Sequence, residues 1–307
     1  MVYYAREEHS DALQYLHNAL EIEKTNLDND ENIAVTKVHI GMAYNGKKEF
    51  ILALKYLLDA YDMYSHILPQ GHPDIGWTAA NIGNSYEDQE NYEKALHYYL
   101  QAYEINEKIL SSEHQDLTLD LNRIVNCYLK KGEDDKALSF AKQKLDEQIV
   151  KLSENHPRIA YTFQTIANIL QSQNRIDDAL DYYQRSLNIF KQHLPSEQEP
   201  IIQCLILKSK LYFKHNQFQD ALDIRLEVLS LQENLYSSQH IDIADSLLFI
   251  GRLCKYYRNY SAALQYFEKA LKIYQANYES DNVVIKNVFN EIAVIERELN
   301  NRQLQND

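Results

Sequence analysis

The stretch Asn91-Tyr-Glu-Lys-Ala-Leu-His-Tyr-Tyr-Leu-Gln-Ala-Tyr103 decides the fold of this chain, because its Ala-Leu pair returns at a nearly constant interval. The alanine recurs after 41 residues once and after 42 residues five times, at Ala12, Ala53, Ala95, Ala137, Ala179, Ala221 and Ala263. The position twelve residues before six of these alanines usually holds a small side chain. Its residues are Gly41, Gly83, Val125, Ala167, Ser209 and Gly251. Small residues at matching positions let two helices approach closely. The period therefore predicts helical hairpins that stack one on the next.

A bulky residue follows three positions after the small one, at Tyr44, Tyr86, Tyr128, Leu170, Tyr212 and Cys254. The pattern of a small residue, this tyrosine and a later Ala-Leu-x-aromatic-aromatic run resembles the tetratricopeptide repeat. The 42-residue period and the His72-Pro73 and His156-Pro157 pairs resemble its kinesin light chain subclass. This resemblance implies an all-α fold, a right-handed superhelix (α-solenoid) of helix-turn-helix hairpins.

We expect one solenoid domain over residues 1–307, because seven glycines and five prolines leave no stretch that reads as a flexible linker. The predicted units are a partial first repeat at 1–26, full repeats at 33–69, 75–110, 117–153, 159–194, 201–236 and 243–279, and a C-terminal capping helix at 284–300.

The first residues of the chain raise two alternatives. Met1-Val2-Tyr3 aligns with Met42-Ala43-Tyr44, which predicts that the chain begins inside a first helix of a hairpin. The helix that follows would then expose Leu13, Leu16 and Leu20 without their hairpin partner. Our hypothesis is that the sequence is a fragment or starts at an internal methionine; the alternative is a natural start whose leucines form a self-association surface.

Composition bounds the function. A net charge of −14 argues against binding of nucleic acid, which requires a basic surface. No apolar run is long enough to cross a bilayer, so we expect no membrane partner. The three cysteines, Cys127, Cys204 and Cys254, lack metal or disulfide spacing and are expected to be packed thiols of a reducing compartment. The chain is therefore expected to be soluble and cytoplasmic.

The sequence gives no sign of catalysis. It contains no G-x-G-x-x-G, G-x-x-x-x-G-K-[ST], H-E-x-x-H or G-x-S-x-G motif. Four histidines share one phase of the repeat, His72, His114, His156 and His240, and one histidine per hairpin does not make a metal site. We expect them to cap or shape the turn into each first helix. The prediction is a protein that is not an enzyme and has no cofactor or metal.

In the family, the first helices line a concave groove, and this resemblance assigns groove positions by register. The residue after each small one gives Asn84, Asn126, Asn168, Lys210 and Arg252. Asparagine offers both donors and an acceptor, so three in a row can pair with the main chain of an extended peptide. The family commonly uses such asparagines to hold peptides.

The other inferred groove positions carry charge and apolar surface. Arg123, Lys130, Lys214 and Lys255 add to Lys210 and Arg252, against the acidic Glu87, Asp88 and Asp245, which leaves an excess of three positive charges. Trp77 and Tyr161 are candidates for side-chain pockets. Together they predict an acidic peptide ligand. Arg225 departs from the family pattern, because an aromatic or apolar residue is common at its position.

The functional prediction is a non-catalytic protein–protein interaction module, a scaffold or adaptor that binds a short, acidic peptide of a partner protein. The alternative is that these repeats are the targeting arm of an enzyme whose catalytic domain lies upstream of Met1.

Overall fold

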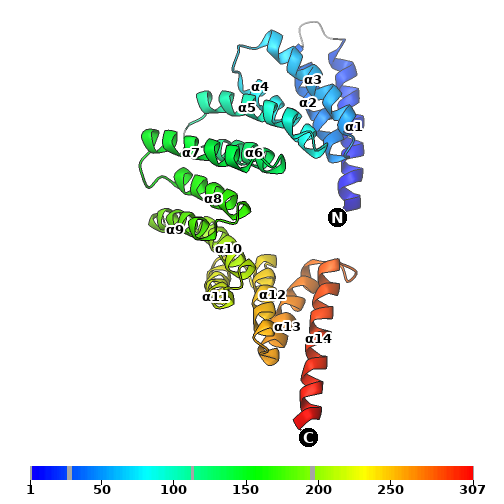
Figure 1. Cartoon of the computed structure of the whole chain (residues 1–307). Coiled ribbons are helices and arrows are strands. Elements are labelled where there is room, and N and C mark those ends of the chain that lie inside the picture. Colours follow the sequence, from blue (N-terminus) through cyan, green and yellow to red (C-terminus); the bar gives the residue numbers. More distant parts are fainter. Residues whose placement is uncertain (1, 26–29, 112–113, 194–197, 307) are drawn as a thin grey trace. The chain divides into compact units, whose positions relative to one another are not determined.

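The computed structural model describes residues 2–25, 30–111, 114–193 and 198–306, and these residues form fourteen α-helices without a strand. The all-α prediction is confirmed. The chain divides into two compact units, Met1–Gln173 and Asn174–Asp307, and each is described by itself (Figure 1). The single solenoid domain stays a prediction.

The helices of each unit follow one another as antiparallel hairpins. Unit 1 contains α1 (Val2–Glu23), α2 (Asp30–Gly46), α3 (Phe50–Ile67), α4 (Pro73–Asp88), α5 (Tyr92–Ile109), α6 (Gln115–Lys130), α7 (Asp134–Lys151) and α8 (Pro157–Ser172). Unit 2 contains α9 (Ile176–Gln192), α10 (Gln198–Lys214), α11 (Phe218–Leu235), α12 (Ile241–Tyr256), α13 (Tyr260–Asn277) and α14 (Val283–Asn306). Within a unit, each hairpin such as α4–α5 or α12–α13 also packs against the first helix of the next.

The small residues predicted to permit close helix approach do so. A Cβ added to Gly83 would lie 2.5 Å from the ring of Tyr99, and one added to Gly251 would lie 2.5 Å from the ring of Phe267. Both rings are fully or almost fully buried. The glycines are therefore required because an aromatic side chain of the second helix fills the space beside them.

The turn inside each hairpin has one repeated conformation. The residue two positions before the second helix has a positive φ, at Lys48, Glu90, Gly132, Asn174, Asn216 and Arg258. After α4, the N–H of Glu90 donates to the carbonyl of Glu87 at 2.8 Å and the N–H of Asn91 donates to that of Tyr86 at 2.9 Å. These two bonds are the Schellman motif, which satisfies carbonyls left free at a helix C-terminus. The repeated tyrosine of the sequence pattern supplies one of those carbonyls.

The histidines of the repeat cap the first helices, as predicted. The Nδ1 atom of His156 accepts a 3.1 Å hydrogen bond from the N–H of Arg158 at the start of α8. His72, His114 and His240 accept the equivalent bond at 3.3 Å at the starts of α4, α6 and α12. Each ring satisfies a backbone donor that has no partner within the helix.

The prediction for the first residues is wrong in two respects. Residues Val2–Glu23 form one continuous helix, without a turn between a first and a second helix. Leu13 and Leu20 are 6% and 4% exposed, because they pack against Ile40 and Ala43 of α2, with Leu16 partly buried beside them. A leucine stripe available for self-association is therefore not present on α1.

The three cysteines are buried free thiols, as predicted. Burial raises the pKa of Cys127 to about 12, so this thiol stays protonated and unreactive at neutral pH. No helix in the described part of the chain is both long and apolar enough to span a bilayer.

Candidate functional site

The predicted groove residues lie on first helices of both units. In unit 1 these are Trp77 and Asn84 on α4, Arg123, Asn126 and Lys130 on α6, and Tyr161 and Asn168 on α8. In unit 2 they are Lys210 and Lys214 on α10, and Arg252 and Lys255 on α12. We therefore describe two separate surfaces.

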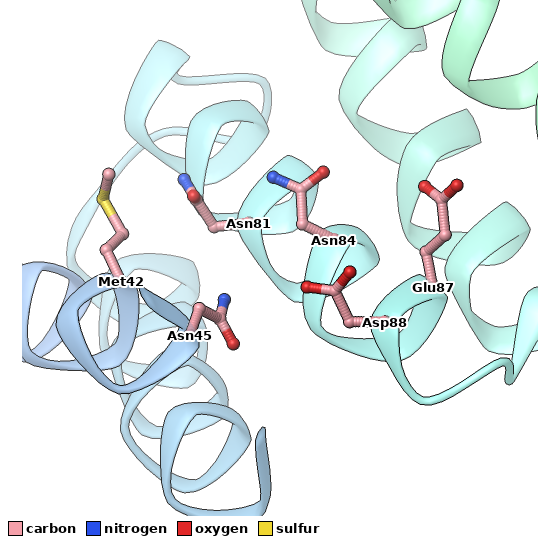
Figure 2. Close-up of a pocket in the computed structure, with 6 residues that line it drawn as sticks. All are labelled: Met42, Asn45, Asn81, Asn84, Glu87 and Asp88. Atoms are coloured by element: carbon pink, nitrogen blue, oxygen red, sulfur yellow. The ribbon is translucent and has the colours of Figure 1, made fainter. Parts of the chain in front are cut away.

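Unit 1 carries an open pocket of about 440 Å³ between α2 and α4, which we call the amide pocket. Its lining residues are Met42, Asn45, Asn81, Asn84, Glu87 and Asp88. Figure 2 shows Met42 and Asn45 on one helix and Asn81, Asn84, Glu87 and Asp88 along the neighbouring helix, with Glu87 on the side of the view opposite Met42. Of the predicted asparagine ladder, only Asn84 lines this pocket; Asn126 and Asn168 are exposed at the same position of α6 and α8.

Hydrogen bonds fix how the amides face the pocket. The hydroxyl of Tyr99 lies 2.8 Å from Oδ1 of Asn84 and 2.7 Å from Oε2 of Glu87. The Ser85 hydroxyl donates to Oδ1 of Asn45 at 2.8 Å. Each hydroxyl has one proton, so Tyr99 donates to one of its two neighbours at a time, and so does Ser85, which also lies 3.1 Å from the carbonyl oxygen of Asn81. The amides of Asn45 and Asn84 therefore offer a ligand N–H donors as well as oxygen acceptors.

The predicted cations of unit 1 are paired with carboxylates. Nη1 of Arg123 lies 2.9 Å from Oδ1 of the buried Asp120, and Nζ of Lys130 lies 3.0 Å from Oε1 of Glu87. The sequence-based charge count left Asp120 out because it does not occupy a groove position. The count already gave unit 1 no positive excess, with two cations against Glu87 and Asp88, and the buried Asp120 adds a further negative charge beside Arg123.

The two apolar candidates of unit 1 differ in their surroundings. The Trp77 side chain is 39% exposed, and its ring centroid lies 5.7 Å from that of His39 on α2. Tyr161 is half-buried on α8. Neither lines the amide pocket, so their role as side-chain pockets stays a prediction.

Unit 2 carries a larger open pocket of about 630 Å³, which we call the basic pocket. It is lined by Phe213, Lys214, Asn216, Phe218, Arg252, Lys255, Tyr256, Arg258, Tyr260 and Glu291. Three of the predicted cations therefore come together here, with Arg258 added and Lys210 left outside. The lining has four cationic side chains and one carboxylate, an excess of three positive charges.

The basic pocket forms where two successive hairpins turn. Lys214 and Phe218 lie at the end of α10 and the start of α11, while Tyr256 and Tyr260 occupy the same places one hairpin later. Cations in the last turn of a helix complement the negative end of its dipole, which is a local reason for Lys214 and Lys255.

Aromatic rings form one wall of the basic pocket. The ring centroids of Phe218 and Tyr256 are 3.8 Å apart, and those of Phe213 and Phe218 are 5.4 Å apart. Tyr256 keeps 58% of its surface exposed. Exposed, mutually supported rings of this kind offer a rigid apolar contact at low entropic cost.

Glu291, like Arg258, lines the basic pocket although the sequence did not predict it there. It projects from α14 and accepts from Nζ of Lys255 at 2.8 Å and from Nε of Arg252 at 3.3 Å. Burial acts to raise the pKa of Glu291, but the hydrogen bond from Lys255 and the two positive charges outweigh it and lower that pKa. Glu291 aligns with Arg123 in the repeat, so extending the groove register to the last helix would have found it.

No group of three His, Cys, Asp or Glu side chains in the described part of the chain is placed to hold a metal ion. The cysteines are in the core, and the four repeat histidines use Nδ1 as helix caps. The chemistry that these surfaces offer is hydrogen bonding, ion pairing and apolar contact.

Comparison with solved structures shows the same fold in several proteins. The chain is similar to the nearly identical TPR-like repeats of a putative kinesin light chain from Podosopora anserina, with 19% identity, a TM-score of 0.54, and coverage of 68% of this chain and 99% of that one. It is also similar to aspartyl phosphate phosphatase F from Bacillus subtilis, with 15% identity, a TM-score of 0.59, and coverage of 90% and 74%. A Rap protein complexed with competence and sporulation factor gives 15% identity, a TM-score of 0.51, and coverage of 98% and 87%.

At these identities, the similarities establish the fold alone. No curated protein matches the chain in sequence. The model of the tetratricopeptide repeat matches residues 32–108, 74–146, 117–192 and 204–276, which together span most of the chain. Repeats of this kind imply protein–protein interaction. The chain belongs to the tetratricopeptide repeat family.

Proposed function

We propose that this protein is a non-catalytic adaptor or scaffold that binds an acidic peptide segment of a partner protein in the basic pocket of unit 2. One observation carries the proposal: four cationic side chains, an exposed aromatic wall and a single carboxylate line one open pocket with a volume of about 630 Å³. Acidic side chains would pair with Lys214, Lys255 and Arg252, and an aromatic side chain would pack beside Tyr256.

The ligand class follows from the contrast between this pocket and the whole molecule. The chain carries a net charge of −14, so an acidic segment is repelled by most of the surface and attracted only where cations gather. Electrostatic complementarity of this kind determines where a ligand binds and which class of partner is selected, and it contributes less to the affinity itself. We expect a dissociation constant in the micromolar range, which corresponds to a binding free energy of about −8 kcal/mol. The affinity is moderate because an extended peptide loses conformational entropy when it is ordered.

The amide pocket of unit 1 supports a second, less specific contact. Its amide N–H groups would donate to main-chain carbonyls, a form of recognition that does not depend on ligand sequence. The Rap protein of the same fold, solved with its competence and sporulation factor, is an example of a relative that binds a ligand.

The test uses the full chain and a fluorescein-labelled probe peptide with one tryptophan between two pairs of aspartates. A matched peptide carries asparagines in place of the aspartates. Binding is measured by fluorescence polarisation for the wild type and for Lys214→Glu/Lys255→Glu. We expect the double variant to weaken aspartate-peptide binding by more than roughly tenfold.

Lys269→Glu/Lys272→Glu is the matched control, because both lysines are exposed on α13 and neither lines the pocket. It should leave the affinity within about twofold of the wild type, since charges beyond a screening length contribute little. Equal binding of the two peptides to the wild type, or equal effects of the two charge reversals, would contradict the proposal.

A further inference from the structure

Arg225 on α11 places a cationic side chain in the core of unit 2. Its side chain is 3% exposed, and its Nε atom has no hydrogen-bond partner. No carboxylate of the described residues lies within ion-pair distance of it, and Asp245 on α12 is the acidic residue whose charge acts on it. Burial lowers the pKa of Arg225 to about 10, which leaves the guanidinium charged at neutral pH.

The fold does not need a cation at this position. The equivalent residues of other hairpins are Leu57, Tyr99, Ala141, Tyr183 and Phe267, and all five are buried core side chains. An unpaired charge in the interior destabilises a protein, and replacing it with an apolar residue of similar size is often neutral or stabilising. Arg225 is therefore a feature that costs stability, and its benefit has to be sought outside the packing of unit 2.

One partner of Arg225 is an aromatic ring. Its Cζ atom lies 4.2 Å from the ring centroid of Phe249 on α12. The same two repeat positions hold Tyr99 and Arg123 in unit 1, with aromatic and cation exchanged and a distance of 5.9 Å. There, however, Asp120 neutralises Arg123, whereas Ser246 takes the place of Asp120 in unit 2.

The ring connects Arg225 to the basic pocket. The centroid of Phe249 lies 5.2 Å from that of Phe213, which lines the pocket. The 4.2 Å from the Arg225 guanidinium to the Phe249 ring and the 5.2 Å from there to the Phe213 ring place the guanidinium within about 10 Å of the pocket wall. This distance is close to the screening length in physiological salt. A buried charge is screened less than a surface lysine, so its field reaches the pocket.

We infer that Arg225 is a specificity-determining residue of the basic pocket: a buried positive charge that contacts Phe249, next to the pocket residue Phe213, and favours acidic over neutral ligands at the expense of fold stability. The inference rests on the proposed function. Arg225 does not touch the ligand; it acts through Phe249 and through its charge.

The experiment uses two variants, Arg225→Leu and Arg225→Tyr. Leucine and tyrosine are the residues that other hairpins have at the equivalent position, at Leu57 and at Tyr99 and Tyr183. The full-length variants are compared with the wild type by thermal unfolding and by binding of the aspartate and asparagine peptides. We expect a higher unfolding midpoint for at least one variant. We also expect aspartate-peptide binding to weaken on the order of three- to tenfold, with asparagine-peptide binding changed by less than about twofold.

A purely structural role would weaken both peptides equally, and unchanged aspartate-peptide affinity would mean that the buried charge does not reach the pocket; either result overturns the inference. Lys214→Glu/Lys255→Glu, measured alongside, separates the two proposals. If that variant weakens aspartate-peptide binding while the Arg225 variants do not, the proposed function stands and the inference fails. If it has no effect, both are overturned.

Discussion

The hydroxyl of Ser246 donates a 2.7 Å hydrogen bond to Oε1 of Gln232, and both residues are completely buried. The bond joins the second helix of one hairpin, α11, to the first helix of the next, α12. The same two repeat positions form hydrogen bonds between Thr162 and Gln148 at 2.8 Å and between Asn106 and Asp120 at 2.7 Å. A buried polar contact thus recurs at the junctions between hairpins, where it favours one arrangement of the helices.

We predict that Ser246→Ala destabilises the protein by about 1–3 kcal/mol, because it leaves Oε1 of Gln232 buried without a donor. Urea unfolding of the full chain measures the change. Ser246→Thr is the matched control, since Thr162 occupies the same repeat position and makes the same bond. If the alanine variant is as stable as the threonine variant, the junction bond does not contribute.

The hairpin turns give a second prediction. Gly132 has a φ of 73°, and no atom outside its own neighbourhood lies within 4 Å of an added Cβ. Gly132→Ala should therefore cost about 1–2 kcal/mol through backbone strain alone, without a steric clash. Gly132→Asn should cost less than half as much, because asparagine tolerates this conformation and occupies it at Asn174 and Asn216.

Thermal unfolding of the two variants measures this difference. Equal destabilisation by alanine and asparagine would show that the turn does not select residues by their φ preference. The comparison also bears on Lys48, Glu90 and Arg258, which hold the same conformation without glycine or asparagine.

The hairpins could be predicted from the sequence because their determinants are local and repeated. The ring of Tyr99 packs so closely on Gly83 that only glycine fits there, and the 42-residue period places an equivalent contact position in each hairpin. The capping histidines were predicted for the same reason. The turn conformation was not predicted, because residues as different as Glu90 and Arg258 adopt it.

The start of the chain and the charge of the groove were harder to predict, because they depend on contacts between elements. Leu13 and Leu20 were expected to be exposed, yet a second helix also packs on the first helix that follows it, here α2. Counting charges by register treated each residue alone. It could not show that Asp120 neutralises Arg123 or that α14 brings Glu291 to Lys255.

The ion pairs of Glu291 predict a pH dependence. Burial acts to raise its pKa, but Lys255 and Arg252 hold the pKa of Glu291 below the ordinary value of 4.5. A carboxyl group whose pKa is lower in the folded state stabilises the fold above its unfolded pKa, and this contribution is lost as the pH falls through the folded value. The wild type should therefore be more stable than Glu291→Gln above pH 4.5, and the difference should shrink as the pH falls below it.

Urea unfolding of both proteins at a series of pH values tests this, because titration of the other carboxyl groups is common to the two and cancels. Glu296→Gln serves as the control: this residue is exposed on the same helix. A stability difference that stays constant below pH 4.5 would mean that the charge of Glu291 does not stabilise unit 2.

The last prediction concerns binding. The carboxylate of Glu291 already occupies Arg252 and Lys255 in the place that an acidic ligand would use, so a ligand has to compete with it. Glu291→Gln removes the competing charge and raises the positive excess of the pocket from three to four. We expect it to tighten aspartate-peptide binding on the order of three- to tenfold, while the neutral asparagine peptide changes little. Because the same substitution lowers stability and raises affinity, a variant that merely damages the fold cannot produce this result. Weaker binding of the aspartate peptide would instead show that Glu291 orients the two cations for the ligand.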